Sequence, residues 1–180
     1  MGDFSEPSVT LVLGGARSGK SVYGERLAER FGGPMTYLAT GEAGDDEMTA
    51  RIADHRARRG NRWTTVEEPL ELADAVTRAD KSGGAVLVDC LTLWIANLMA
   101  VERDIAAESL RLAECLKAVE GAVVLVTNEV GLGIVPDNAD ARAFHDHAGR
   151  LNQSIAQVAH NVVFVAAGLP MILKGEDLNA

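Results

Sequence analysis

Short apolar runs alternate along the chain with longer stretches whose apolar positions recur every three or four residues. The runs are rich in β-branched residues and end at glycines or polar residues, which is typical of buried strands. They cover residues 9–13, 35–39, 64–66, 85–89, 122–127, 162–166 and 171–173. The stretches between them predict helices at residues 21–31, 45–59, 70–81, 91–99, 105–119 and 139–159.

This alternation of strands and helices predicts an α/β fold with a mostly parallel central sheet and helices on both of its faces, in three layers. The chain of 180 residues shows no linker, internal repeat or low-complexity segment, so we expect a single domain over residues 1–180. In sheets of this kind, ligands bind at the carboxyl ends of the strands. The residues that follow each apolar run are therefore the first candidates for a functional site.

The first apolar run is followed at once by the pattern G-x-x-x-x-G-K-S and then by a helical stretch. Glycines let the backbone curl so that its N–H groups point at phosphate oxygens, and the dipole of the following helix favours the same negative charge. We expect Lys20 to reach the β- and γ-phosphates and Ser21 to ligate Mg²⁺. The sequence therefore predicts a P-loop that binds a nucleoside triphosphate through Gly14, Gly15, Ala16, Arg17, Ser18, Gly19, Lys20 and Ser21.

Asp89 is the last residue of the apolar run at residues 85–89. A carboxylate at the end of a buried strand commonly supplies a second Mg²⁺ ligand in P-loop proteins. Asp89 also precedes a helical stretch, where the same side chain would serve as an N-cap. Its place at a strand end favours a role in the site, as a metal ligand or as a contact with the nucleotide.

The helix predicted at residues 45–59 carries His55 on its apolar stripe, with Arg51, Arg58 and Arg59 three or four residues away. Three guanidinium groups should lower the pKa of His55 and keep the imidazole in its neutral, nucleophilic form. The same arginines are suited to gripping a triphosphate through paired hydrogen bonds. The spacing alone slightly favours a solvated basic helix end, in which His55 has no chemical role.

The segment N-E-V-G-L-G-I-V-P at residues 128–136 follows another apolar run and contains two glycines and a proline. A segment of this kind forms either a substrate-binding loop or a tight connection between a strand and a helix. The polar residues Asn128 and Glu129 at the strand end favour the substrate-binding loop.

Composition narrows the class of protein. The formal net charge of −9 argues against a general nucleic-acid binder, which needs a basic surface. Cys90 and Cys115 lie in apolar surroundings without metal-binding spacing, and we expect both to be reduced core residues in a cytoplasmic protein. The beginning of the chain lacks a signal-peptide pattern, and the longest apolar stretch, residues 162–173, is too short to span a membrane.

Taken together, these motifs resemble one enzyme family, the bifunctional adenosylcobinamide kinase/adenosylcobinamide-phosphate guanylyltransferases of cobalamin biosynthesis. The resemblance covers residues 11–174. It is carried by G-G-A-R-S-G-K-S at residues 14–21, by D-E-M-x-x-R-I-x-x-H at residues 46–55 of the predicted helix, and by the N-E-V-G-x-G-I-V-P loop. W-x-T-V-E at residues 63–67 and A-G-R-x-N-Q at residues 148–153 match as well. Many families share the P-loop, whereas the histidine helix and the loop together are specific.

The resemblance implies a RecA-like P-loop NTPase fold and a two-step transferase. In the first step ATP or GTP phosphorylates the hydroxyl of the aminopropanol arm of adenosylcobinamide. In the second, the family's histidine, which is His55 by motif position, attacks GTP at the α-phosphate and forms a covalent guanylyl-histidine. The corrinoid phosphate then takes the GMP, which gives adenosylcobinamide-GDP.

The resemblance also implies the nucleotide contacts of the site and a homotrimer. Mg²⁺ is expected at Ser21 and Asp89 from the P-loop and the strand end, and the predicted catalytic residues are His55, by its motif position, and Lys20, from the P-loop. Besides the P-loop, the guanine-nucleotide contacts that the resemblance implies fall on Ala39, Thr40, Gly41, Arg56, Ala57, Arg58, Arg59, Glu67 and Asp89.

Two other functions remain open from the sequence. One is a simple P-loop kinase of a small molecule, in which His55 is structural and no covalent adduct forms. The other is a nucleotide-binding regulatory module that hydrolyses slowly and acts through a partner. Neither nucleic acid nor a membrane span is expected for any of them.

Overall fold

The computed structural model describes residues 7–41, 62–82 and 84–176. Its strands are β1 (Ser8–Gly14), β2 (Met35–Ala39), β3 (Trp63–Glu67), β4 (Ala85–Asp89), β5 (Ala122–Asn128), β6 (Asn161–Ala166) and β7 (Leu169–Lys174). Its helices are α1 (Lys20–Phe31), α3 (Leu72–Asp80), α4 (Leu91–Ala100), α5 (Ile105–Leu116) and α6 (Ala139–Val158). Every element predicted within these ranges is present, with ends shifted by a few residues. The helix predicted at residues 45–59 lies outside the described residues.

The strands form one seven-stranded sheet in the order β3-β2-β4-β5-β1-β6-β7. All neighbouring pairs are parallel except β6 and β7, which are antiparallel at one edge. The central strands are apolar at nearly every position because helices cover both faces of a parallel sheet. In β5, for example, all residues from Ala122 to Thr127 are buried. The predicted mostly parallel sheet is confirmed.

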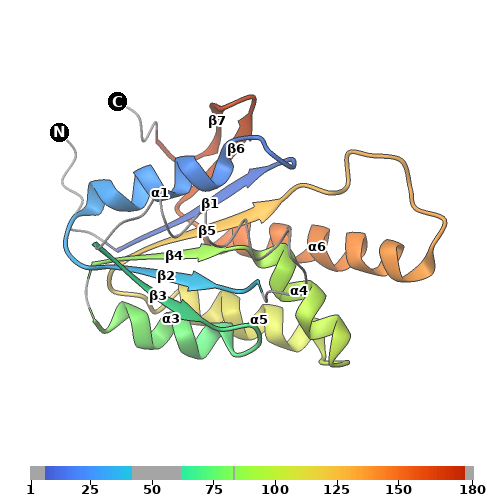
Figure 1. Ribbon diagram of the computed structural model, residues 1–180, viewed down its shortest axis with the longest axis horizontal. Coiled ribbons are helices and arrows are strands. Elements are labelled where there is room, and N and C mark those ends of the chain that lie inside the picture. Colours follow the sequence, from blue (N-terminus) through green and yellow to red (C-terminus); the bar gives the residue numbers. More distant parts are fainter. Residues whose placement is uncertain (1–6, 42–61, 83, 177–180) are drawn as a thin grey trace.

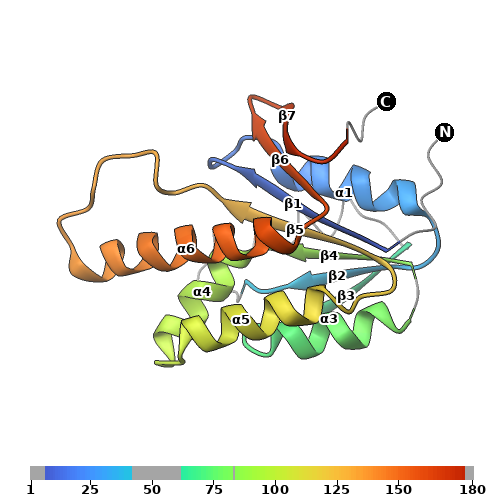
Figure 2. The ribbon, with the colours of Figure 1, turned by 180° about the vertical axis from the view of Figure 1, so that it is seen from behind.

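The helices lie on both faces of the sheet, as the alternating pattern predicts. Figure 1 and the reverse view in Figure 2 show α1 on one face and α3, α4, α5 and α6 on the other. Each face has its own apolar core, because successive side chains of a strand point to opposite sides. On the α1 side, Gly24 allows a close approach, since a Cβ atom there would lie 3.1 Å from Val126 Cγ2.

Helix α4 is the most apolar of the described helices, and its side chains Leu91, Ile95 and Leu98 are buried. Its sequence LTLWIANLMA has ten residues, and Trp94 is completely buried, with its indole N–H donating to the Leu70 carbonyl oxygen at 2.8 Å. A helix of this length spans about 15 Å, half the thickness of a bilayer core. Within residues 7–41, 62–82 and 84–176, no helix has the length and apolarity needed to cross a membrane.

The parallel register brings the residues at the strand ends into one row. Gly14 at the end of β1 pairs with Asn128 at the end of β5. Ala39 at the end of β2 pairs with Asp89 of β4 on one side and with Glu67 of β3 on the other. The predicted site residues on four apolar runs, and Asn128 on a fifth, therefore meet at the same carboxyl edge of the sheet.

At the amino ends of the parallel strands, Gly84 is required where the chain enters β4. Its φ is +81°, and a Cβ atom there would lie 1.8 Å from the Pro34 carbonyl oxygen. We expect Gly84→Ala to lower the free energy of unfolding by at least about 2 kcal/mol, because both the backbone conformation and the contact become strained. Urea denaturation followed by circular dichroism would measure this loss.

Gly149 provides the matched control for this prediction. It lies in the middle of α6, and a Cβ atom there would meet nothing within 4 Å. Gly149→Ala should therefore raise the free energy of unfolding by about 0.5–1 kcal/mol, since alanine restricts the unfolded chain. Equal stabilities of the two variants would contradict the tight junction at Gly84.

Candidate active site at the carboxyl edge of the sheet

The predicted P-loop connects β1 to α1 in the middle of the sheet. Gly14 leaves no room for a side chain, because a Cβ atom there would lie 2.5 Å from Ser18 Oγ and 2.6 Å from the Val165 carbonyl oxygen. Gly19 has a φ of +96°, and a Cβ atom there would lie 3.2 Å from Gly168 Cα. The two end glycines of the motif are therefore needed for the tight curl of this loop against β6 and the turn that follows it.

The loop carries the groups that an anionic ligand requires. Helix α1 begins at Lys20, directly after Gly19, and no side chain caps its first turn. The first backbone N–H groups of a helix have no partner within it, and the dipole adds positive potential there. The Lys20 ammonium group lies over the loop, where it donates to the Gly15 carbonyl oxygen at 3.2 Å. This arrangement suits the phosphates of a nucleotide.

The turn between β6 and β7 is hydrogen-bonded to the P-loop. The Gly168 N–H donates to the Ser18 carbonyl oxygen at 2.8 Å. Within the loop, the Ser18 N–H donates to the Gly15 carbonyl oxygen at 3.3 Å. The cradle is thus held both by its own turn and by a segment 150 residues later in the chain, a contact that no local pattern in the sequence indicates.

Asp89 lies at the end of β4, as predicted. Its Oδ2 accepts a hydrogen bond from the Tyr37 hydroxyl at 3.2 Å, so a residue of β2 orients this carboxylate. The alternative that Asp89 caps the next helix is wrong, since the N-cap of α4 is Cys90 and no side chain caps this helix. The peptide bond between Asp89 and Cys90 is cis.

The Thr40 side chain joins the ends of β2 and β4. It is completely buried, and its hydroxyl donates to the Cys90 carbonyl oxygen at 2.7 Å and accepts from the Cys90 N–H at 2.9 Å. The side-chain amide of Asn97 in α4 donates to the Thr40 carbonyl oxygen at 2.7 Å and to the Pro69 carbonyl oxygen at 3.1 Å. Thr40 therefore ties the chain after Asp89 to the end of β2, and Asn97 ties α4 to the segments that follow β2 and β3.

The predicted core residues Cys90 and Cys115 are both free thiols. Burial raises the pKa of the Cys90 thiol, and the neighbouring Asp89 carboxylate raises it further. A thiol with a raised pKa is protonated at neutral pH and is a weak nucleophile. Cys90 therefore has a packing role, while Cys115 is only half buried against the core.

Asn128 and Glu129 tie β5 to its neighbours at the same edge. The Asn128 side-chain amide donates to the Thr92 hydroxyl at 2.7 Å, and the Glu129 N–H donates to the Gly14 carbonyl oxygen at 3.1 Å. Asn152, a buried residue of α6, accepts from the Thr127 hydroxyl at 2.9 Å. The first residues of the predicted loop are therefore joined to the P-loop by a hydrogen bond.

Several supporting residues were not singled out from the sequence as parts of the site. Tyr37, Thr92 and Asn97 each hold a residue at the strand ends. The available signal was a polar group inside an otherwise apolar element, such as the asparagine in LTLWIANLMA. A buried polar side chain of this kind requires a hydrogen-bond partner, although its sequence does not say which one.

The predicted site residues fall into two groups, one within the described residues and one outside them. Gly14, Gly15, Ala16, Arg17, Ser18, Gly19, Lys20, Ser21, Ala39, Thr40, Gly41, Glu67 and Asp89 are described and lie on or next to the strand ends and the P-loop. His55 and the arginine-rich run Arg56, Ala57, Arg58 and Arg59 lie outside the described residues.

Comparison with known proteins decides the family. The model of the family described as "cobinamide kinase / cobinamide phosphate guanyltransferase" matches residues 10–173. The bifunctional adenosylcobalamin biosynthesis protein CobP of Pseudomonas aeruginosa is 50% identical over 170 residues, which cover 93% of this chain and 98% of that protein. The chain belongs to this family. The proteins named CobU in Escherichia coli and Salmonella typhimurium are each 39% identical over 179 residues, or 91% of this chain and 98% of theirs.

Solved structures similar to this one share its fold at low sequence identity. The flagellar accessory protein FlaH of Methanocaldococcus jannaschii has a TM-score of 0.56 and 16% identity over 98% of this chain and 82% of its own. The RadB recombinase has a TM-score of 0.55 and 17% identity, covering 91% of this chain and 76% of its own. A KaiC-like protein of Pyrococcus horikoshii has a TM-score of 0.56 and 14% identity, covering 98% of this chain and 83% of its own. The predicted RecA-like P-loop NTPase fold is confirmed.

The family resemblance inferred from the motifs is likewise confirmed, and with it the expected class of enzyme. The cobinamide kinase / cobinamide phosphate guanyltransferase family combines the two activities that the resemblance implies. The two alternatives left open by the sequence, a simple kinase and a regulatory module, do not match the family description.

The predicted metal ligands have the right chemistry for a magnesium ion. Ser21, in the first turn of α1, offers a hydroxyl oxygen, and Asp89 offers a carboxylate. Mg²⁺ prefers such hard oxygen ligands and usually keeps few protein ligands beside phosphates and waters. Among the described residues, no group of three or more histidine, cysteine or acidic side chains is placed to hold a metal. A metal held jointly by Ser21, Asp89 and a nucleotide is compatible with this donor set.

The paired hydrogen bonds between Thr40 and Cys90 give a test of the architecture. Thr40→Val removes the hydroxyl, which leaves the buried Cys90 N–H without a partner and leaves the Cys90 carbonyl oxygen with only the Trp94 N–H. We expect this change to lower the free energy of unfolding by about 1–3 kcal/mol, because an unsatisfied buried N–H keeps its desolvation cost. Urea denaturation measures the loss.

Thr40→Ser is the matched control, since it keeps the hydroxyl and removes only a methyl group. It should remain within about 1 kcal/mol of the wild type. If the valine variant proved as stable as the serine variant, the assigned role of the Thr40 hydroxyl would be wrong.

Proposed function

We propose that this protein catalyses two consecutive reactions at a single nucleotide site formed by the P-loop. It first transfers the γ-phosphate of ATP or GTP to the hydroxyl of adenosylcobinamide, and then transfers GMP from GTP to the product to form adenosylcobinamide-GDP. The observation that carries this proposal is a complete P-loop on the carboxyl edge of the sheet in a chain of the cobinamide kinase / guanyltransferase family. The motif occurs once in the sequence, which favours one shared site.

In the first reaction, the backbone N–H groups of the P-loop and the Lys20 ammonium group hold the phosphates. The cobinamide hydroxyl oxygen forms a bond with the γ-phosphorus, the bond to the β–γ bridging oxygen breaks, and the hydroxyl proton is released. Negative charge then grows on the departing nucleoside diphosphate. Donors placed beforehand around that charge lower the barrier, since they need no rearrangement during the reaction.

In the second reaction, we propose His55 as the nucleophile on the strength of its motif. One imidazole nitrogen attacks the α-phosphorus of GTP, and pyrophosphate leaves. A phosphate oxygen of cobinamide phosphate then attacks the same phosphorus, the N–P bond breaks, and His55 is restored. Imidazole suits this role because it is both a nucleophile and a leaving group near neutral pH.

The remaining residues of the site have proposed roles in holding GTP and its metal. Ser21 and Asp89 would hold Mg²⁺, which neutralises phosphate charge when bound. Tyr37 orients the Asp89 carboxylate for this task. Supported by the family resemblance, the proposed contacts with the guanine nucleotide are Ala39, Thr40, Gly41, Arg56, Ala57, Arg58, Arg59, Glu67 and Asp89.

We also propose that the protein acts as a cytoplasmic homotrimer, with residues 1–180 forming one domain that does not bind nucleic acid. The trimer is supported only by resemblance to the family. The acidic balance, with a net charge of −9, supports the absence of nucleic-acid binding.

Labelling with GTP tests the covalent step. Protein incubated with Mg²⁺ and GTP labelled at the α-phosphate should retain label after denaturation, and the bond should be labile in acid and stable in alkali. His55→Ala should retain no label while still binding GTP. His147→Ala is the matched control and should be labelled as the wild type is, because His147 lies on α6 and has no proposed role.

The outcomes separate the candidate functions. A wild-type chain that binds GTP and phosphorylates cobinamide but takes no label would be a kinase without the covalent step. A labelled His55→Ala variant would show that another residue is the nucleophile. Either result would refute the proposed second reaction.

A further inference from the structure

The loop between β5 and α6 exposes a run of apolar side chains beside the P-loop. Leu132, Ile134 and Val135 are 82%, 96% and 75% exposed. Figure 1 shows this loop projecting from the carboxyl end of β5, beyond the rest of the sheet. Residues 130–135, V-G-L-G-I-V, contain no charged side chain. Burying large apolar side chains is favourable by about 1.5–3 kcal/mol each, so such exposure points to a ligand or partner.

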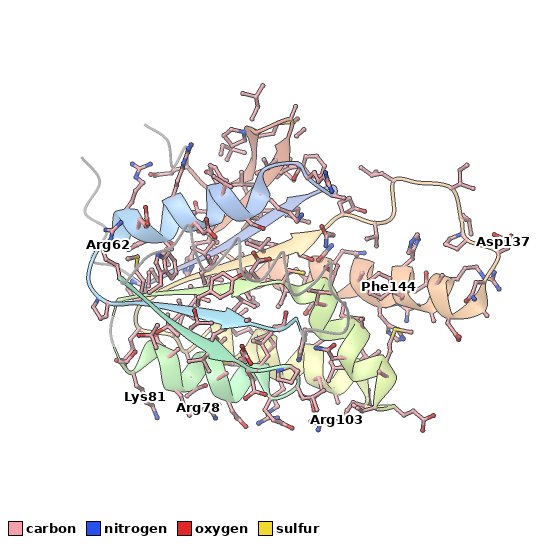
Figure 3. The ribbon with its side chains drawn as sticks, in the orientation of Figure 1. Arg62, Arg78, Lys81, Arg103, Asp137 and Phe144 are labelled. Atoms are coloured by element: carbon pink, nitrogen blue, oxygen red, sulfur yellow. The ribbon has the colours of Figure 1, made fainter. Side chains whose placement is uncertain are left out.

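Both ends of the loop are anchored to the molecule. At its beginning, Val130 packs against the core, and the Gly131 N–H donates to Glu129 Oε1 at 2.7 Å. At its end, the Arg142 guanidinium donates to the carbonyl oxygens of Pro136 and Asp137 at 2.9 and 2.7 Å. Figure 3 places Asp137 at the outer end of the loop, where the chain turns into α6. The apolar side chains are therefore presented by a supported loop.

The inner end of the loop reaches the phosphate cradle. Asn128 pairs with Gly14 in the sheet, and the Glu129 N–H donates to the Gly14 carbonyl oxygen at 3.1 Å. Moving outward from the P-loop, a ligand would therefore meet polar groups first and apolar side chains next. A molecule that matches this order has a short polar arm attached to a large body with apolar faces.

Cobinamide has this construction. Its aminopropanol arm carries the hydroxyl that is phosphorylated, and its corrin ring presents broad apolar faces with uncharged amides around the rim. We propose that residues 130–135 bind the corrin ring and so place the hydroxyl of the arm at the P-loop. The inference rests on the proposed function, since cobinamide is the substrate assumed. Leu132, Ile134 and Val135 contact the ring, while the open backbone at Gly133 faces its amides.

Kinetics of the phosphorylation step test this assignment. In the double variant Leu132→Ser/Ile134→Ser, the KM for adenosylcobinamide should rise at least about tenfold, because two apolar contacts with the ring are lost. The KM for GTP should stay within about twofold of wild type, since the phosphate cradle is unchanged. Leu110→Ser, on the exposed side of α5 with 61% exposure, is the matched control and should alter neither value.

The result that overturns the inference is distinct from the one that overturns the function. A wild-type chain that does not phosphorylate adenosylcobinamide would refute the proposed function and this inference with it. Wild-type turnover combined with an unchanged KM for cobinamide in the double variant would refute the inference alone. A changed sedimentation coefficient of the double variant would also refute it, because the loop would then be a contact between subunits.

Discussion

The structure depends on the absence of a side chain at Gly14. This residue ends the strand that lies between β5 and β6, and both Ser18 Oγ and the Val165 carbonyl oxygen occupy the space where a Cβ atom would be. The chain therefore turns sharply at the middle of the carboxyl edge, and α1 begins within a few residues. Since the sheet is parallel here, the ends of β2, β4 and β5 reach the same edge. The phosphate cradle and the residues around it thus follow from one steric constraint.

A second layer of polar contacts keeps the strand ends in place around that cradle. Thr40 joins β2 to β4 through two hydrogen bonds to Cys90, and Asn128 joins β5 to Thr92 at the start of α4. These groups are buried or half buried, so each contact is stronger than it would be in water and is costly to lose. Asp89 lies between them and is held in addition by Tyr37. The described strand ends of the site are thereby held by contacts within the protein itself.

The fold was largely predictable because its signals are local. Each central strand is a short apolar run, and the P-loop is recognised from fixed spacing between Gly14 and Ser21. Element ends were less predictable. The helix expected to reach residue 119 ends at Leu116. Beyond it, the N–H groups of Lys117 and Ala118 bond to carbonyl oxygens three residues back, which forms a turn and not a further helical turn.

The supporting contacts of the site could not be predicted for a physical reason. Thr40 and Cys90 are 50 residues apart, and Asn128 and Thr92 are 36 apart, so their pairing depends on strand order and register. A sequence shows that a buried polar group needs a partner but does not identify that partner. The same holds for Asp89, whose sequence context also suggested a helix cap until the position of Cys90 decided the matter.

The central claim is that one phosphate cradle serves both reactions, and Lys20→Met tests it most directly. Phosphorylation would be followed with GTP labelled at the γ-phosphate, and GMP transfer with GTP labelled at the α-phosphate and cobinamide phosphate supplied directly. We predict that both rates fall at least about 100-fold while the fold is retained, since the Lys20 ammonium group stabilises charge in both transition states. Lys117→Met, which alters an exposed lysine of the α5 C-terminus, should leave both rates unchanged. Loss of phosphorylation with GMP transfer at the wild-type rate would contradict the shared site and require a second place for GTP.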